Sequence, residues 1–400
     1  SRRVARHVSL ARRRQLIELW ASPEPTIARI SENDWRDQLA ETGHDARLDD
    51  VDLIAGLGVQ ATRYPVLWER NDFAWARPRL ERLRERGVEP IVTILHHGSG
   101  PAYTSLVDPE FPQRFAEYAA AAACEFPWVR RWTPINEPLT TARFATLYGH
   151  WYPNLRDDRA FGTAITNEAR AIQLAFGRIR ARIPDAELTI TEDLQGFTAA
   201  NSAAEADAQF YRERSFLSLE LVMGRVKPGH ALWRYLTETA GVSPSMLRDI
   251  AEYAVEPHTI GWNWYPYSER VLCRRDGELV DAGAVTLQGY EVSPRPLLRD
   301  AYRRLGRPQA IAEVHLHAPE DARAAWLLAR YDDALSLQAE GVPMTAVGAW
   351  AAFGMVDWDS LLLERRDIVE DGIFTFARAG ETPQETAVSH TLRDLALCPR

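Results

Sequence analysis

The chain has 400 residues, of which 46% are hydrophobic and 26% are charged, and its formal net charge is −9. This apolar content is enough for a large buried core and excludes a disordered, collagen-like or disulfide-stapled chain. The acidic balance argues against a nucleic-acid partner, and the lack of any run of about 18 apolar residues argues against a membrane span.

The N-terminal segment 1–14 is rich in arginine and lacks the apolar stretch of a secretory signal, so we interpret it as a surface lead-in. The three cysteines, Cys124, Cys273 and Cys398, are odd in number and widely spaced. This pattern favours free thiols in a reducing compartment, and a cytoplasmic location is therefore expected.

Eight short apolar runs have the length and composition of β-strands, since each is bounded by Gly, Pro or charge and is rich in Ile, Val, Thr and aromatics. In chain order they are Leu16–Trp20, Ala61–Leu67, Pro90–Leu95, Arg131–Ile135, Glu187–Thr191, Thr259–Trp264, Gln309–Ala312 and Ala346–Ala351. Segments with helical periodicity lie between them: Leu48–Leu57, Pro78–Arg86, Phe111–Glu125, Ala160–Arg182 and Arg323–Glu340.

Eight alternations of strand and helix predict an α/β fold, a closed parallel (β/α)8 TIM barrel forming one domain over residues 1–400. An open doubly wound sheet is the alternative. It would need a glycine-rich phosphate loop after the first strand, and residues 16–26 contain no glycine.

The predicted strand ends carry polar and aromatic residues, and in a TIM barrel the chemistry lies at these ends. They are Trp20, Glu24, Arg63, Trp68, His96, His97, Asn136, Glu137, Glu192, Asp193, Asn263, Tyr265, Glu313, His315, His317, Trp350, Asp357 and Trp358. Aromatic rings beside carboxylates suit a sugar, whose ring faces stack while its hydroxyls need hydrogen-bond partners. Because successive strand residues point to opposite faces, one of His96 and His97 is expected to pack outside the barrel lumen.

Glu137 and Glu313 directly end the fourth and seventh predicted strands. A lone carboxylate in such a place is more often a helix cap or a surface residue. Glycoside cleavage, however, needs two carboxyl groups flanking one bond, one protonated and one ionised, and opposite sides of a barrel mouth can supply them.

Several segments resemble the motifs of glycoside hydrolase family 1, the β-glucosidase family, in the same order along the chain. Residues 132–138 (WTPINEP) resemble its T-x-N-E-P signature. The other similar segments are 63–70 (RYPVLWER), 92–101 (VTILHHGSGP), 260–265 (IGWNWY), 311–315 (IAEVH) and 350–358 (WAAFGMVDW).

The departures from the family pattern gather at substrate contacts. Pro65 stands in place of a serine, His97 in place of a tryptophan, and Ala28 near the position of the strand-one glutamine, for which Glu24 is a candidate replacement. In residues 311–315, only Glu313 and an apolar neighbour match the nucleophile motif. The chain therefore resembles a divergent branch whose members are often joined to a sugar-nucleotide reductase-like domain.

The resemblance implies a retaining β-glycosidase that needs no cofactor or metal and acts on a small-molecule glycoside. In that family pattern Glu313 would be the nucleophile, Glu137 the general acid/base, and Asn136 the contact of the sugar 2-hydroxyl. The remaining implied or candidate contacts are Arg63, His96, Tyr265, Trp350, Asp357, Trp358, Glu24 and Glu192. The carboxylates at the rim predict that anionic sugars are disfavoured, and they favour an aminosugar or deoxysugar on a natural-product or glycolipid aglycone.

Three alternatives remain open. One is a carbohydrate-binding or regulatory barrel without turnover, because fold alone does not establish catalysis. Another is a transglycosidase acting on a natural-product or glycolipid glycoside. The third is a metal-dependent hydrolase using His96, His315, His317 and Glu192, although the nearby charge of Arg63 opposes a cation. The oligomeric state is not indicated by the sequence.

Overall fold

The computed structural model describes residues 17–284 and 292–397. The arginine-rich segment 1–14 and Cys398 lie outside these residues, and Cys124 and Cys273 are free cysteines. No helix in the described ranges is both long and apolar enough to cross a membrane.

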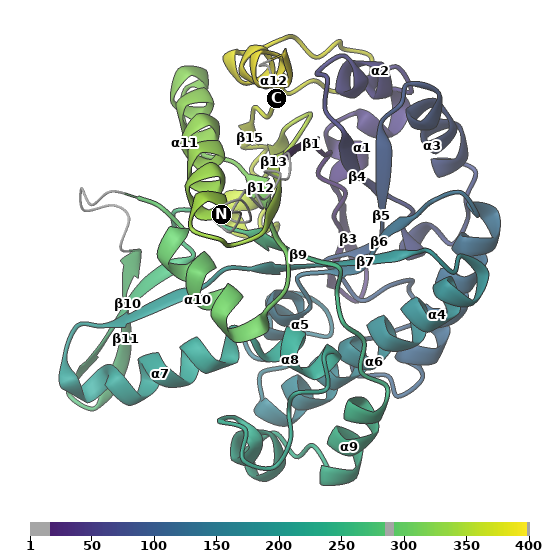
Figure 1. Cartoon of the computed structure of the whole chain (residues 1–400). Coiled ribbons are helices and arrows are strands. Elements are labelled where there is room, and N and C mark those ends of the chain that lie inside the picture. The colour runs from purple at the N-terminus through teal and green to yellow at the C-terminus, as the bar shows by residue number, and fades with distance from the viewer. Residues whose placement is uncertain (1–16, 285–291, 398–400) are drawn as a thin grey trace, which may run out of the picture.

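Eight parallel strands form a closed barrel, which confirms the predicted fold (Figure 1). In chain order they are β1 (Glu18–Ala21), β4 (Ala61–Pro65), β5 (Glu89–His96), β6 (Arg131–Asn136), β7 (Glu187–Asp193), β9 (Thr259–Asn263), β12 (Gln309–Val314) and β13 (Met344–Ala349). Each strand pairs with the next one along this series, and β13 returns to β1. That the whole of residues 1–400 makes one domain stays a prediction.

The helices lie outside the ring of strands (Figure 1). They are α1 (Gln38–Glu41), α2 (Asp50–Ala55), α3 (Ala76–Glu85), α4 (Phe111–Glu125), α5 (Pro138–Thr146), α6 (Asp158–Arg182), α7 (Glu205–Arg214), α8 (Leu217–Val222), α9 (Pro244–Glu252), α10 (Arg295–Leu305), α11 (Glu320–Ala339) and α12 (Ala387–Leu397). The five predicted helical segments correspond to α2, α3, α4, α6 and α11.

Three small sheets were not predicted from the sequence. The pairs β2 (Ile27–Ser31) with β3 (Asp34–Asp37) and β14 (Met355–Val356) with β15 (Val369–Glu370) are antiparallel, whereas β8 (Gly196–Ala199) extends the hairpin of β10 (Glu269–Arg275) and β11 (Glu278–Ala284). The β10–β11 hairpin and α7 stand to one side of the barrel (Figure 1).

The barrel interior is filled by one large ring surrounded by small residues. Trp20 of β1 is fully buried, and a cluster drawn from five strands can form only inside the ring. Its members are Trp20, Ala61, Ile91, Ala310, Ala312 and Ala346. The alanines leave the space that the indole occupies, as close packing requires.

The ring closes between β1 and β4 with few backbone contacts. These strands share one register pair, Trp20 with Ala61, whereas β1 shares four with β13. The side-chain oxygen of Gln60 accepts a 2.8 Å hydrogen bond from the Leu19 N–H, and the backbone N–H of Gln60 donates to the Leu19 carbonyl at 3.0 Å. Ser22 adds a further link, since its hydroxyl accepts from the Arg63 N–H at 2.9 Å.

Candidate active site

A cavity of about 750 Å³ opens at the carboxyl ends of the barrel strands. Its walls include residues that end or directly follow β5, β6, β7, β9 and β12, together with the loop after β13. Among the predicted site residues, Glu24, Glu137, Tyr265, Glu313 and Trp358 line it. Three more of the predicted residues contact these lining residues: Arg63 donates to Glu313, Trp350 donates to Glu24, and His96 Nε2 lies 3.8 Å from Glu24. Asn136 contacts His97, which also lines the cavity.

Glu313 receives a hydrogen bond on each carboxyl oxygen. Arg63, from β4, donates to Oε1 at 2.7 Å and forms a buried ion pair with it. Tyr265, just after β9, donates its hydroxyl to Oε2 at 2.7 Å. Burial and the charge of Glu313 raise the pKa of the Tyr265 phenol well above its usual range, so Tyr265 remains the donor.

Glu137 lies between β6 and α5, and Pro138 begins the helix, where its fixed φ is favourable. The φ of Glu137 is 45°, a left-handed conformation that is uncommon outside glycine and is found at functional sites. Asn263 of β9 donates to its Oε1 at 2.6 Å. Burial, followed by the charges of Glu313 and Asp193, raises the pKa of Glu137 well above its usual range despite this hydrogen bond.

Asn136 connects four neighbouring strands. Its Oδ1 accepts from Arg63 at 2.5 Å and from the Thr191 hydroxyl at 2.7 Å. Its Nδ2 lies 3.2 Å from Nε2 of His96 and 3.4 Å from Nε2 of His97. An amide nitrogen can only donate, so both imidazoles must be neutral acceptors here.

The prediction that His96 and His97 point to opposite sides of the strand is wrong. Both side chains are buried and reach Asn136, and His97 also lines the cavity. The physical reason is the φ of 55° at His97, which ends the extended geometry of β5 and turns the second ring to the same side. Burial lowers the pKa of His97 to about 3 and that of His96 well below its usual range, consistent with neutral rings.

Glu24 rather than Ala28 is the residue of the first loop that reaches the cavity. Its carboxyl accepts from the Thr26 hydroxyl at 2.6 Å, the Thr26 N–H at 3.0 Å and the Trp350 indole at 3.2 Å. Burial raises its pKa to about 7. Ala28 is fully buried in β2, in a separate apolar cluster with Trp151.

Two further predicted contact residues, Glu192 and Asp357, do not line the cavity. Glu192 accepts from the Leu139 N–H at 2.9 Å and the Ser218 hydroxyl at 2.7 Å, and its neighbour Asp193 lines the cavity instead. Asp357 accepts from Arg36 at 3.0 Å and from the Ile368 N–H at 2.8 Å, so both of its oxygens are occupied. Glu192 therefore links α5 to α8, and Asp357 links its loop to Arg36 and Ile368.

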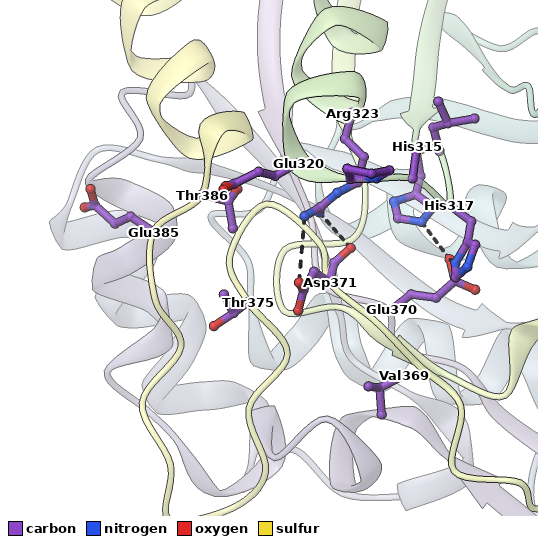
Figure 2. Close-up of a pocket in the computed structure, with 13 residues that line it drawn as sticks. His315, His317, Glu320, Arg323, Val369, Glu370, Asp371, Thr375, Glu385 and Thr386 are labelled. Atoms are coloured by element: carbon purple, nitrogen blue, oxygen red, sulfur yellow. Dashed lines mark hydrogen bonds and ion pairs between the residues drawn. The ribbon is translucent and has the colours of Figure 1, made fainter.

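The sequence analysis missed Glu370, which lies on the two-residue strand β15. Its Oε2 is 2.9 Å from Nε2 of His315 and 3.0 Å from Nδ1 of His317 (Figure 2). All three residues line both the main cavity and a second one of about 560 Å³. In the described part of the chain, no group of three or more His, Cys, Asp or Glu side chains is arranged to hold a metal ion.

No family model matches the chain. It is 24% identical over 367 residues to β-glucosidase A of Thermotoga maritima, an alignment that covers 80% of each chain. Shorter matches include β-glucosidase 4 of Oryza sativa subsp. japonica, 29% identical over 26% of this chain and 25% of that protein. The probable inactive β-glucosidase 14 of the same plant is 25% identical over 29% of this chain and 25% of that protein.

The fold is similar to that of the family 1 β-glucosidase from Thermotoga maritima, with a TM-score of 0.77 at 19% identity over 96% of this chain and 98% of that one. The complex of a Thermotoga maritima β-glucosidase with cyclophellitol gives a TM-score of 0.75 at 17% identity over 96% and 97%. The resemblance predicted from the motifs is thus confirmed over nearly the whole length of the barrel.

Proposed function

We propose that the chain is a retaining β-glycosidase that acts by double displacement, with Glu313 as the nucleophile and Glu137 as the general acid/base. The observation that carries the proposal is the pair itself. One glutamate is ion-paired with a buried arginine, and the other is buried with a raised pKa. Glycoside cleavage by two carboxyl groups requires this division into one ionised and one protonated member.

In the first step, Glu137 donates its proton to the leaving oxygen while Glu313 attacks the anomeric carbon. Arg63 and Tyr265 hold the attacking carboxylate in place through its two oxygens. Once Glu313 is glycosylated its negative charge is gone, and with it one cause of the raised pKa of Glu137. The pKa of Glu137 then falls, and the carboxylate becomes the base that activates water.

The neighbouring polar groups would position the sugar. The Asn136 side chain is oriented by Arg63 and Thr191 and would bind the 2-hydroxyl, a contact that strengthens in the transition state. Trp358 lines the cavity, and its buried indole N–H has no partner in the structure, so it can stack on a sugar face and donate to a hydroxyl. Glu24 would accept from a hydroxyl or an amino group of the substrate.

A carbohydrate-binding barrel without turnover is the second candidate. It is favoured by the altered motif after Glu313 and by the match to a probable inactive relative. The two candidates share the cavity, so a covalent readout must distinguish them.

A 2-deoxy-2-fluoro aryl β-glycoside provides that readout, because the fluorine slows the second step and lets the glycosyl-enzyme accumulate. We expect mass spectrometry of the whole chain to show one added glycosyl group, mapped by digestion to Glu313. Glu313→Gln is the control and should stay unlabelled. A chain that binds the glycoside but remains unlabelled would establish the binding protein instead. The proposal also requires the two carboxyl groups to be about 5–5.5 Å apart, since a separation of about 6.5–9.5 Å belongs to inverting enzymes.

A further inference from the structure

Two buried arginines beside the main cavity have no acidic partner. Arg143 on α5 and Arg214 at the end of α7 are 6% and 5% exposed. Within the described residues, neither has a carboxylate within 4.0 Å, since no ion pair includes them. Their hydrogen bonds go to hydroxyls alone, from Arg143 to Thr140 at 3.3 Å and from Arg214 to Tyr148 at 3.3 Å, and the Arg143 Nε has no partner.

The other buried arginines of the described ranges are satisfied differently. Each donates to a carboxylate or to backbone carbonyls, and they are Arg29, Arg36, Arg63, Arg79, Arg323 and Arg330. A charge taken out of water is costly unless it is paired and fully hydrogen-bonded. Arg143 and Arg214 differ from these six because neither a carboxylate nor a backbone carbonyl accepts their hydrogen bonds.

The two guanidinium groups converge on one phenol. Burial alone raises the pKa of Tyr148, yet the charges of Arg143 and then Arg214 outweigh it and lower that pKa. Arg214 also lies over the Tyr211 ring, with its Cζ 4.5 Å from the centroid. The nearest acidic influences on Arg143 are Glu192 and Asp193, and the Asp193 oxygens already accept from Ser268 and Gln195.

The cluster lies next to the wall of the main cavity, which it reaches through Thr140. Thr140, three residues before Arg143 on α5, accepts its hydrogen bond and lines the cavity. The same helix begins directly after Glu137, the proposed proton donor to the leaving oxygen. Three of the cavity carboxyl groups oppose an anion little, since Glu24 and Glu137 have raised pKa values and Glu313 is paired with Arg63.

We propose that Arg143, Arg214 and Tyr148 form an oxyanion site that binds a phosphate or similar dianionic group. Two guanidiniums and a hydroxyl supply the forked donors and the charge that such a group needs. The group is either part of the substrate's aglycone or free inorganic phosphate. The first of these sources rests on the proposed function.

The first test measures binding of inorganic phosphate by thermal unfolding of the whole chain, against chloride at equal ionic strength. Phosphate should raise the unfolding temperature in a saturable way, because it binds the folded state. Arg143→Gln and Arg214→Gln should each weaken phosphate binding by about tenfold or more, and Tyr148→Phe, which keeps the ring, should weaken it severalfold. The control is Arg234→Gln, a change at an exposed arginine, which should bind phosphate as the unmodified chain does. No stabilisation beyond that of chloride would overturn the site.

The second readout is stability without phosphate. Removing an uncompensated buried charge should raise the unfolding temperature of Arg214→Gln in phosphate-free buffer, whereas removing an arginine that only supports the fold would lower it in every buffer. The proposal would be overturned if Arg214→Gln had a lowered unfolding temperature both with and without phosphate and if Tyr148→Phe bound phosphate as the unmodified chain does.

The third readout identifies the source. Two aryl β-glycosides are compared whose rings carry either a hydroxymethyl or a phosphomethyl group. A higher kcat/KM for the phosphorylated glycoside, lost in Arg143→Gln, supports an anionic aglycone. Phosphate binding with equal kcat/KM for both glycosides supports free phosphate and contradicts the aglycone. Phosphate binding with no hydrolysis of either glycoside keeps the site and contradicts the proposed function.

Discussion

The charge state of Glu137 depends on its carboxylate neighbours as well as on burial. The negative charge of Asp193 raises the pKa of Glu137, and the Asn263 hydrogen bond lowers it. We expect Asp193→Asn to lower the pKa of Glu137. Since the acid must be protonated to donate, the basic limb of the kcat/KM profile should then move to lower pH.

A pH series of kcat/KM with one aryl glycoside measures this shift. Asp185→Asn is the control, because that carboxylate is exposed and should leave the profile in place. A basic limb that moves to higher pH in Asp193→Asn would mean that Glu137 is not the titrating acid.

Glu137→Ala tests the same residue through the leaving group. Loss of general acid help should slow turnover by about 10²–10⁴ for a poor leaving group. The loss should be much smaller for a dinitrophenyl glycoside, which departs without a proton. Steady-state kinetics over a series of aryl leaving groups measures the difference, and equal losses across the series would contradict the assignment.

At the scale of elements, the sequence predicts the barrel well because its eight strands are short and apolar and are bounded by glycine, proline or charged residues. It also predicts Glu137, Glu313 and Glu24, since parallel strands deliver the residues at their ends to one rim. It could not predict the approach of Glu370, because β15 has two residues and is positioned only by pairing with β14. Nor could it predict that His96 and His97 act together, since the left-handed φ at His97 has no signature in the sequence.

The same scale offers a test of how closely β12 and β13 must pack. A Cβ on Gly348 of β13 would lie 2.5 Å from the Ala312 carbonyl oxygen, one residue before Glu313. Gly348→Ala should therefore push β12 outward, destabilise the fold by about 1–3 kcal/mol and reduce kcat without changing any proposed site residue. Thermal unfolding and kinetics measure the two effects. Gly177→Ala, on the open side of α6, is the control because its Cβ meets no atom within 4 Å.

At the scale of the whole molecule, buried carboxyl groups link stability to pH. Glu168 on α6 is fully buried, neither of its oxygens has a hydrogen-bond partner, and burial raises its pKa well above the usual 4.5. The folded chain thus binds more protons than the unfolded chain above pH 4.5, so its stability falls as the pH rises through that range.

Replacing this carboxyl by an apolar side chain of similar length removes that penalty. Glu168→Met should stabilise the chain by about 1–3 kcal/mol at pH 8 and by less at pH 5. Urea unfolding at the two pH values measures the difference. Glu81→Met, at an exposed position, should show no such pH dependence, and a stabilisation equal at both pH values would contradict the linkage.

The sparse contact between β1 and β4 determines where the barrel is expected to open. One register pair and the side chains of Gln60 and Ser22 hold that seam, so its amides should exchange with deuterium before those of the continuous ladders elsewhere. Gln60→Ala should quicken exchange at the Leu19 amide above all. Because Glu24 lies in the loop after β1, each such opening would also admit water to one wall of the cavity. The lifetime of the assembled site is then set by the least protected pair of strands rather than by the average strength of the ring.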